Sequence, residues 1–164
     1  MFEIEAGQPQ VCETGCFEDM GDAVSGMYRP DIGDATIRWN AVPIRLSYAY
    51  DLYCMIDDLV PLLEVVIPDN FRSAAVYWGS SDFMAEWRID SVDQGVRIDP
   101  QWDVVSGANE SALIDSGSVI VAKEKFVAEW LKILGRIVLD IRRYSVSLSD
   151  GDILDRSASL LASR

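Results

Sequence analysis

The chain has 164 residues, of which 49% are hydrophobic and 10% aromatic, and it carries a formal net charge of −13 with no histidine. This length suits one domain with its own core, and the apolar content excludes a disordered chain. The negative charge disfavours nucleic acids and anionic lipids as partners. The lack of histidine excludes Ser-His-Asp and Cys-His catalysis and histidine-containing zinc sites.

The first residues, Met1–Gly7, have neither the basic nor the apolar region of an export signal, and no apolar run approaches the ~18 residues that span a bilayer. We therefore expect a cytoplasmic protein that forms a single domain over residues 1–164. The only lysines are Lys123, Lys125 and Lys132, so no P-loop and no Ser-x-x-Lys motif occurs. We expect no cofactor and no metal.

The N-terminal segment is acidic. Residues 1–34 hold eight acidic residues against one arginine, a net charge of −7, and we expect them to form an irregular lead-in. Cys12 and Cys16 lie in this segment, and Cys54 is the only other cysteine, so one chain cannot build a four-thiolate zinc site. A mixed site with Glu13 or Asp19, a disulfide and a pair of reduced thiols remain as alternatives, and a cytoplasmic setting favours reduced thiols.

Residues 36–122 are expected to be mainly strands. From Ile44 to Leu52, apolar residues alternate with Arg45, Ser47, Ala49 and Asp51, which predicts one or two strands over 36–54 with these four side chains facing away from the core. A short helix is expected after Met55, ended by Pro61. Further short strands are expected as an antiparallel meander, at 73–78, 83–90, 95–105 and 118–122, with an edge or a bulge near Pro100.

The last part of the chain is expected to be helical. Phe126, Trp130, Ile133, Ile137, Ile141 and Tyr144 recur every three or four residues, which predicts a long amphipathic helix over 123–144. The tail, 145–164, can form one more short helix capped by Asp150 or Asp152. The predicted fold is therefore α+β, with an antiparallel sheet packed against a long C-terminal amphipathic helix.

Acidic residues also gather in the middle of the chain. Residues 51–99 hold ten acidic residues against three arginines, again a net charge of −7. Pairs such as Asp57 with Asp58 could act as catalytic carboxylates only if burial and repulsion separated their pKa values, and in so acidic a chain such pairs arise by chance. Trp78 and Trp87 flank a loop-like stretch, and either they pack in the sheet or they anchor a protein interface.

The stretch SVIVAKEKFVAEWLKILGRIVLDI (118–141), preceded by GVRIDPQWDVV, resembles the closing part of small bacterial immunity proteins. Proteins of this kind are cytoplasmic inhibitors of toxin domains from contact-dependent inhibition and other polymorphic toxin systems. The resemblance is one of pattern, and because these families differ in fold and toxin it carries over no binding residues. It implies an inhibitory rather than an enzymatic function.

Together these features predict that the chain binds a basic protein, of which a nuclease-type toxin domain is the leading candidate. Three other functions remain open, namely a nucleic-acid mimic that inhibits a DNA-binding protein, an enzyme that uses a carboxylate pair, and an accessory or scaffolding domain. The expected contact residues are acids from both blocks with a tryptophan anchor: Glu18, Asp19, Asp22, Asp57, Asp58, Asp82, Glu86 and Asp90, with Trp78 or Trp87.

Overall fold

The computed structural model describes residues 1–163 and is a mixed α+β structure with antiparallel sheets and five α-helices in that range. The strands are β1 (Phe2–Glu5), β2 (Cys16–Phe17), β3 (Ala35–Trp39), β4 (Val42–Leu46), β5 (Ser73–Gly79), β6 (Phe83–Val92), β7 (Gly95–Val105), β8 (Val119–Val121) and β9 (Ser147–Leu148). The helices are α1 (Met20–Met27), α2 (Tyr53–Val66), α3 (Glu110–Ser116), α4 (Lys123–Arg143) and α5 (Asp152–Ala162), with a π-helical turn η1 at Tyr48–Leu52.

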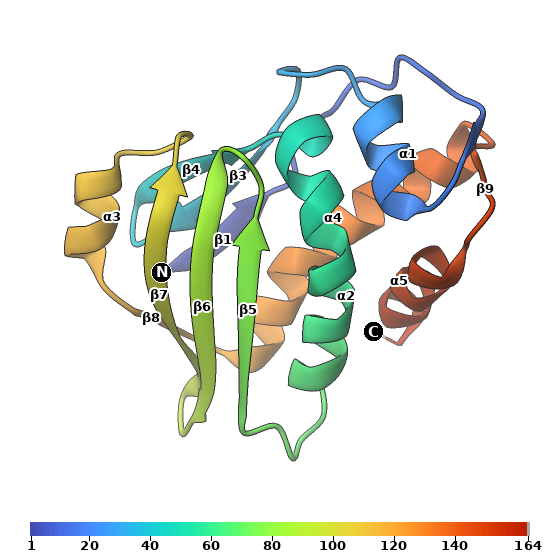
Figure 1. Cartoon of the computed structure of the whole chain (residues 1–164). Helices are drawn as coiled ribbons and strands as arrows, with labels where there is room; N and C mark the ends of the chain where they lie inside the picture. Colours follow the sequence, from blue (N-terminus) through green and yellow to red (C-terminus); the bar gives the residue numbers. More distant parts are fainter. Residues whose placement is uncertain (164) are drawn as a thin grey trace.

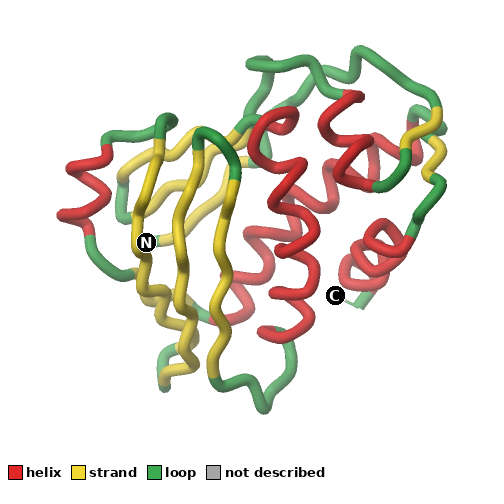
Figure 2. Tube along the Cα trace, in the orientation of Figure 1, coloured by secondary structure: helices red, strands yellow, loops and turns green. Residues whose placement is uncertain are grey.

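Two antiparallel sheets form one side of the molecule and the helices other than α3 gather on the other, while α3 lies beside the strands (Figures 1 and 2). One sheet has the order β1-β3-β4 and the other has the order β5-β6-β7-β8. Helix α4 packs against β1 and β7, and α2 packs against the edge strand β5 and α1. This arrangement puts α2 beside an edge strand and close to the N-terminal helix.

The predicted meander is confirmed. Strands β5 to β8 follow one another antiparallel with the expected bounds, and the hairpin of β6 and β7 turns at 93–94. Among the described residues, strand β8 pairs only with Val96–Ile98, so Pro100 lies where β7 has no second neighbour. The β6 partner of Pro100 is Trp87, and the register shift between β6 and β7 falls further along, between Met84 and Ala85. A proline needs such a position because it cannot donate to a second strand.

The predicted long helix is present as α4, but it is not the last element. Its apolar stripe is buried as expected, except that Tyr144 lies just beyond the helix and is exposed. Helix α5 follows and is held against α2 by Arg156, whose Nε and Nη2 lie 2.9 and 2.7 Å from the carboxylate oxygens of Glu64. The long helix thus buries its apolar face in the core, and α5 follows it in the chain.

The expectation of an irregular lead-in over 1–34 is wrong. Strand β1 pairs with β3 and buries Phe2 and Ile4, and α1 buries Met20, Val24 and Met27. The segment between them is held by the tail, because β2 pairs with β9 and Asp150 N–H donates to the Glu18 carbonyl at 2.7 Å. Glycine and acidic residues suggested disorder, whereas burial of these apolar side chains orders the segment.

The predicted strand over 36–54 ends at Leu46, and the helix after it is longer than expected. The alternation continues in sequence, but η1 turns the chain at Tyr48, so Ser47, Ala49 and Asp51 are buried and Tyr50 is exposed. Helix α2 then continues through Pro61 to Val66. An internal proline costs about 3 kcal/mol in a helix, and the burial of the apolar residues around it offsets that cost.

Eight aromatic side chains form the centre of the core. They come from both sheets and from α4, and they are Phe2, Trp39, Trp78, Phe83, Trp87, Trp102, Phe126 and Trp130. The ring centroid of Trp87 lies 5.1 Å from that of Trp39 and 5.5 Å from that of Trp78. Trp130, expected in the core, has no exposed surface. This cluster joins the two sheets to α4.

Glu129 of α4 closes the free edge of β1. Its buried carboxylate accepts the Ile4 N–H at 2.6 Å and the Lys132 ammonium at 2.5 Å, and Lys132 also donates to the Ile4 carbonyl. We expect Glu129→Ala to lower the free energy of unfolding by about 1–3 kcal/mol, because it leaves a buried backbone N–H without an acceptor. Glu129→Gln, which keeps an acceptor, should lose less in the same urea titration. Equal losses for the two variants would contradict this role.

Within residues 1–163, no helix has both the length and the apolar content to cross a membrane.

Candidate partner-binding surface

The ten predicted contact residues are acids at the start of α1, on α2, in one loop and on β6, together with two core tryptophans. Glu18, Asp19 and Asp22 lie at the start of α1, and Asp57 and Asp58 lie on α2. Asp82 lies in the loop between β5 and β6. Glu86 and Asp90 lie on β6, and Trp78 and Trp87 lie on β5 and β6 with their side chains in the core.

The predicted tryptophan anchor is wrong. Trp78 and Trp87 are 0% exposed, so neither can contact a partner in the folded protein. The strands that carry them alternate between buried and exposed residues, and both tryptophans occupy the buried positions. Both side chains therefore stabilise the core under β5 and β6 and form no part of the protein surface.

The acids at the start of α1 cap the helix. The Asp19 carboxylate accepts the Asp22 N–H at 2.8 Å, and the Asp22 carboxylate accepts the Glu18 N–H at 3.1 Å. This reciprocal pattern satisfies two backbone donors, and the negative charges suit the positive end of the helix dipole. The hydrogen bonds therefore fix the positions of Asp19 and Asp22 in the free protein.

The acids of α1 lie close to those of α2. Gly21 makes this possible, since a Cβ there would stand 2.9 Å from the Tyr53 carbonyl oxygen at the start of α2. Burial, and then the charges of Asp19 and Asp58, raise the pKa of Asp57 above its ordinary value. Among residues 1–163, none of these three carboxylates forms an ion pair. We call Glu18, Asp19, Asp22, Asp57 and Asp58 the acidic surface.

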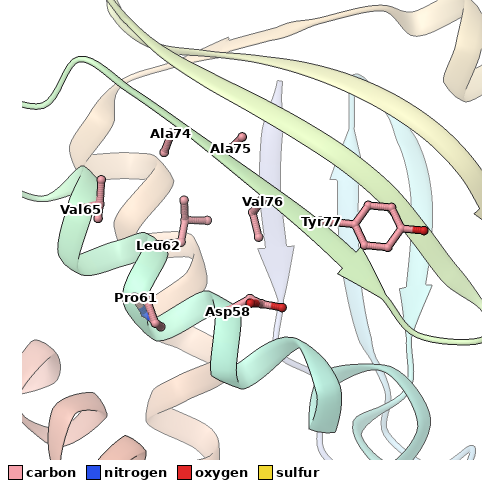
Figure 3. Close-up of a pocket in the computed structure, with 8 residues that line it drawn as sticks. All are labelled: Asp58, Pro61, Leu62, Val65, Ala74, Ala75, Val76 and Tyr77. Atoms are coloured by element: carbon pink, nitrogen blue, oxygen red, sulfur yellow. The ribbon is translucent and has the colours of Figure 1, made fainter.

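An apolar groove lies beside the acidic surface, between α2 and β5 (Figure 3). It has a volume of about 500 Å³, and its lining residues are Asp58, Pro61, Leu62, Val65, Ala74, Ala75, Val76 and Tyr77. The first four are spaced as one face of a helix, and the last four are consecutive residues of an edge strand. Val65 is 51% exposed and Tyr77 is 50% exposed. Apolar side chains next to unpaired carboxylates are a composition suited to an interface.

Glu86 and Asp90 lie outside the acidic surface, on the outer face of the second sheet, where Glu86 is the cross-strand neighbour of Tyr77, which lines the groove. Arg88 stands between them in sequence and pairs with Asp90 at 3.0 Å, and on β7 Arg97 pairs with Asp99 at 2.8 Å. The outer sheet face therefore neutralises much of its own negative charge. It is a poorer docking surface for a basic partner than the acidic surface is.

A second cavity, of about 370 Å³, lies where β4, η1, the β5–β6 loop and the segment after β7 meet. It holds Asp82 together with Asp51, which is only 3% exposed. The Asp51 carboxylate accepts the Ser80 hydroxyl at 2.5 Å and the Ser47 N–H at 2.8 Å. Burial raises the pKa of Asp51, which these hydrogen bonds lower in part and the charge of Asp82 raises further.

The cysteines do not meet. Cys12 and Cys16 are free and exposed, and Cys54 is free and half-buried on α2. In the described part of the chain, no three cysteine or acidic side chains are placed to hold a metal ion together. Cys12 and Cys16 lie in the stretch CETGCFEDMGD (12–22), and only the acids that follow Phe17 in this stretch contribute to the acidic surface.

Asp51 and the apolar side chains of the groove were not among the predicted contact residues. Asp51 was assigned to the exposed face of a strand, and only the π-helical turn, which the alternation conceals, buries it. For the groove a signal was present, because Asp58, Leu62 and Val65 repeat with helical spacing. The predicted helix break at Pro61 concealed that repeat.

We expect Asp57→Asn to stabilise the free protein at pH 7 by a few tenths of a kcal/mol, because it removes repulsion from neighbouring carboxylates. The pKa of Asp57 is raised in the folded state, so protonation of Asp57 favours folding. This contribution to stability is fully present below the pKa of the unfolded chain and is lost as the pH rises through the pKa of the folded protein. The gain should therefore disappear below about pH 4. Urea titrations at low salt measure it, and Asp103→Asn, at an exposed and unpaired position of β7, is the control. An equal gain in stability for Asp103→Asn would contradict the repulsion between Asp57 and its neighbouring carboxylates.

Comparisons with known proteins gave no match: no family model, no curated protein and no solved structure is significantly similar to this chain.

Proposed function

We propose that this chain is an immunity protein, a cytoplasmic non-enzymatic inhibitor that binds a basic toxin domain and covers its active site. The observation that carries the proposal is the acidic surface, where Asp57 and Asp58 stay unpaired beside an apolar groove. Unpaired charges held close together cost stability in the free protein, and a basic partner would turn the same charges into attraction.

A nuclease domain is the toxin class that fits best. Its cleft is built to attract phosphates, so it is rich in lysine and arginine and also attracts carboxylates. The net charge of −13 would speed the encounter of the two proteins at low salt, and the groove would supply the apolar contacts that hold them together. The resemblance of residues 118–141 to immunity proteins agrees with this role.

The decisive experiment begins with the genes next to the gene for this chain, where we expect a toxin domain to be encoded. We expect co-expression of the chain to restore growth of bacteria that express this domain. We also expect the purified chain to abolish the activity of the toxin at one molecule per molecule. If the chain neither restores growth nor binds the domain, the proposal is wrong.

An enzyme acting through a carboxylate pair is the second candidate, and one observation favours it. Asp51, whose pKa is raised, and Asp82 share a cavity, which is the kind of environment that separates a general acid from a base. The same titration distinguishes the two functions. One molecule of an inhibitor neutralises one toxin molecule, whereas one molecule of an enzyme that modifies the toxin would neutralise many.

A nucleic-acid mimic has less support. It would need carboxylates spaced like phosphates along one face, and on the outer sheet face Arg88 and Arg97 interrupt the acids.

A further inference from the structure

The cavity around Asp51, described above, holds more negative charge than its one base can neutralise. Four acids lie in or beside it, namely Asp31, Asp34, Asp51 and Asp82, against the single base Arg45, a net charge of −3 when all are ionised. Arg45 is already engaged, with its Nη2 2.6 Å from Asp31 and its Nε 3.0 Å from Asp34. Its charge acts on Asp51 from a distance, as the smallest of the causes that lower the pKa of that carboxyl.

Asp51 is the carboxylate that most needs a cation. It is buried, and in the part of the chain that the structure describes it has two hydrogen-bond donors and no ion pair. A buried carboxylate without a counter-ion is costly, and an incoming cation would repay that cost. Asp82 also lines the cavity, is exposed and forms no ion pair among residues 1–163, so its carboxylate is open to the same cation.

A second observation, independent of the acids, points to a ligand. Ser47 lines the cavity and is 4% exposed, and within residues 1–163 its Oγ has no hydrogen-bond partner. A buried hydroxyl without a partner is uncommon in a folded protein. Next to Asp51, this oxygen is an acceptor available to an N–H group that enters the cavity.

The backbone around the cavity is fixed in place. Arg45 N–H donates to the Gly107 carbonyl at 3.1 Å, and Ser106 N–H donates to the Asp82 carbonyl at 2.9 Å. Gly107 permits this close approach, because a Cβ there would stand 2.5 Å from the Arg45 carbonyl oxygen. Backbone hydrogen bonds therefore join the end of β4 and the two loops at the rim of the cavity.

The acceptors in the cavity suit a planar, delocalised cation. No three acidic or cysteine side chains of the described residues are placed to hold a metal ion, so a compact divalent cation does not fit. A guanidinium group offers five N–H donors spread over a plane, and it stacks on aromatic rings. Tyr50, which is 50% exposed, lines the cavity and can provide such a ring.

We propose that this cavity receives the guanidinium group of an arginine side chain on the partner. The inference rests on the proposed function, because it takes the partner to be a protein. Tyr50 and Asp51 of the cavity belong to η1, which leads directly into α2, the helix that carries Asp57 and Asp58 of the acidic surface. An arginine held there would lie at one end of α2, while the rest of the partner covers the groove.

The test starts with the free protein and needs no partner. N-acetyl-L-arginine amide is titrated into the ¹⁵N-labelled chain, with N-acetyl-L-citrulline amide as the uncharged isostere. We expect the arginine probe to cause saturable amide shifts at Ser47, Asp51, Ser106 and Gly107, and the citrulline probe to cause none. Equal shifts with both probes, shifts confined to other residues, or no shift at 50 mM would overturn the inference.

Two variants and a control complete the test. Asp82→Asn, at an exposed position, should weaken binding of the arginine probe about tenfold. Asp51→Asn should abolish it in a protein whose spectrum is still that of a folded chain. Glu86→Gln, which removes an unpaired acid on the outer sheet face, should change nothing. If the Asp82→Asn variant binds the arginine probe as tightly as the wild type does, the contact between Asp82 and the guanidinium group is refuted.

The arms also separate the arginine inference from the proposed function. If the probe fails to bind while the toxin domain is still neutralised, only the arginine inference is lost. If the probe binds and no toxin domain does, the cavity is a guanidinium site for a free small molecule, and the claim of a protein partner is refuted. In a complex, Asp82→Asn should raise the dissociation rate constant, and replacing the docked arginine of the partner by lysine should do the same.

Discussion

Replacing Trp87 with alanine should lower the free energy of unfolding by about 3–5 kcal/mol, which is a large part of the stability of a small domain. Trp87 is fully buried, and its ring lies within 5.1–6.2 Å of the rings of Phe2, Trp39, Trp78, Phe83, Trp102 and Trp130. The variant removes the side chain that joins both sheets to α4. Chemical denaturation measures the loss.

Trp87→Phe is the matched control, because it keeps an aromatic ring in the same place. It should lose less stability than the alanine variant, remain folded, and bind the partner as tightly as the wild type. A folded Trp87→Phe variant that no longer bound would restore the tryptophan as an interface anchor. A loss below 1 kcal/mol in the alanine variant would instead contradict the packing of the core.

Reversing the charges of Asp57 and Asp58 to lysine should lower the association rate constant for a basic partner at least tenfold at low salt. The change turns attraction into repulsion at the centre of the acidic surface, where neither carboxylate forms an ion pair among residues 1–163. The salt dependence of association should become weaker at the same time, because fewer opposite charges remain to be screened. Stopped-flow mixing over a range of salt concentrations measures both.

The control for this prediction changes the net charge equally at a distant place. Asp103→Lys with Asp115→Lys does so on β7 and α3, at exposed positions without ion pairs. If the control slows association as much as the Asp57 and Asp58 pair does, then net charge alone drives the encounter. The acidic surface would then have no special role.

Elements with a long, regular pattern could be predicted from sequence. Strands β5 and β6 alternate over their whole length, β7 alternates in its first part, and α4 repeats an apolar stripe through several turns, so these elements emerged with nearly correct bounds. Short or irregular elements could not. Helix α1 has eight residues, two of them glycine, and its signals were only Asp19 as a cap and the spacing of Met20, Val24 and Met27.

The candidate site was predictable only in part. The charges of Asp57 and Asp58 are a property of the sequence, whereas their nearness to Asp19 depends on the packing of α1 against α2 at Gly21. The tryptophans were misjudged although their alternation with exposed neighbours favoured the core. Asp51 was placed on the wrong face because a π-helical turn reverses the strand pattern, and no local residue preference reveals that turn.

The central claim is that a basic partner docks on the acidic surface and in the groove between α2 and β5. Amide hydrogen exchange of the chain, alone and saturated with the toxin domain, tests it most directly. Strand β5 pairs only with β6, so its outward amides exchange freely until something covers them. We predict slowed exchange at β5, at the start of α1 and at the exposed face of α2. Slowed exchange confined to the amides of α4, α5, β6 or β7, with those of β5 unchanged, would contradict the claim.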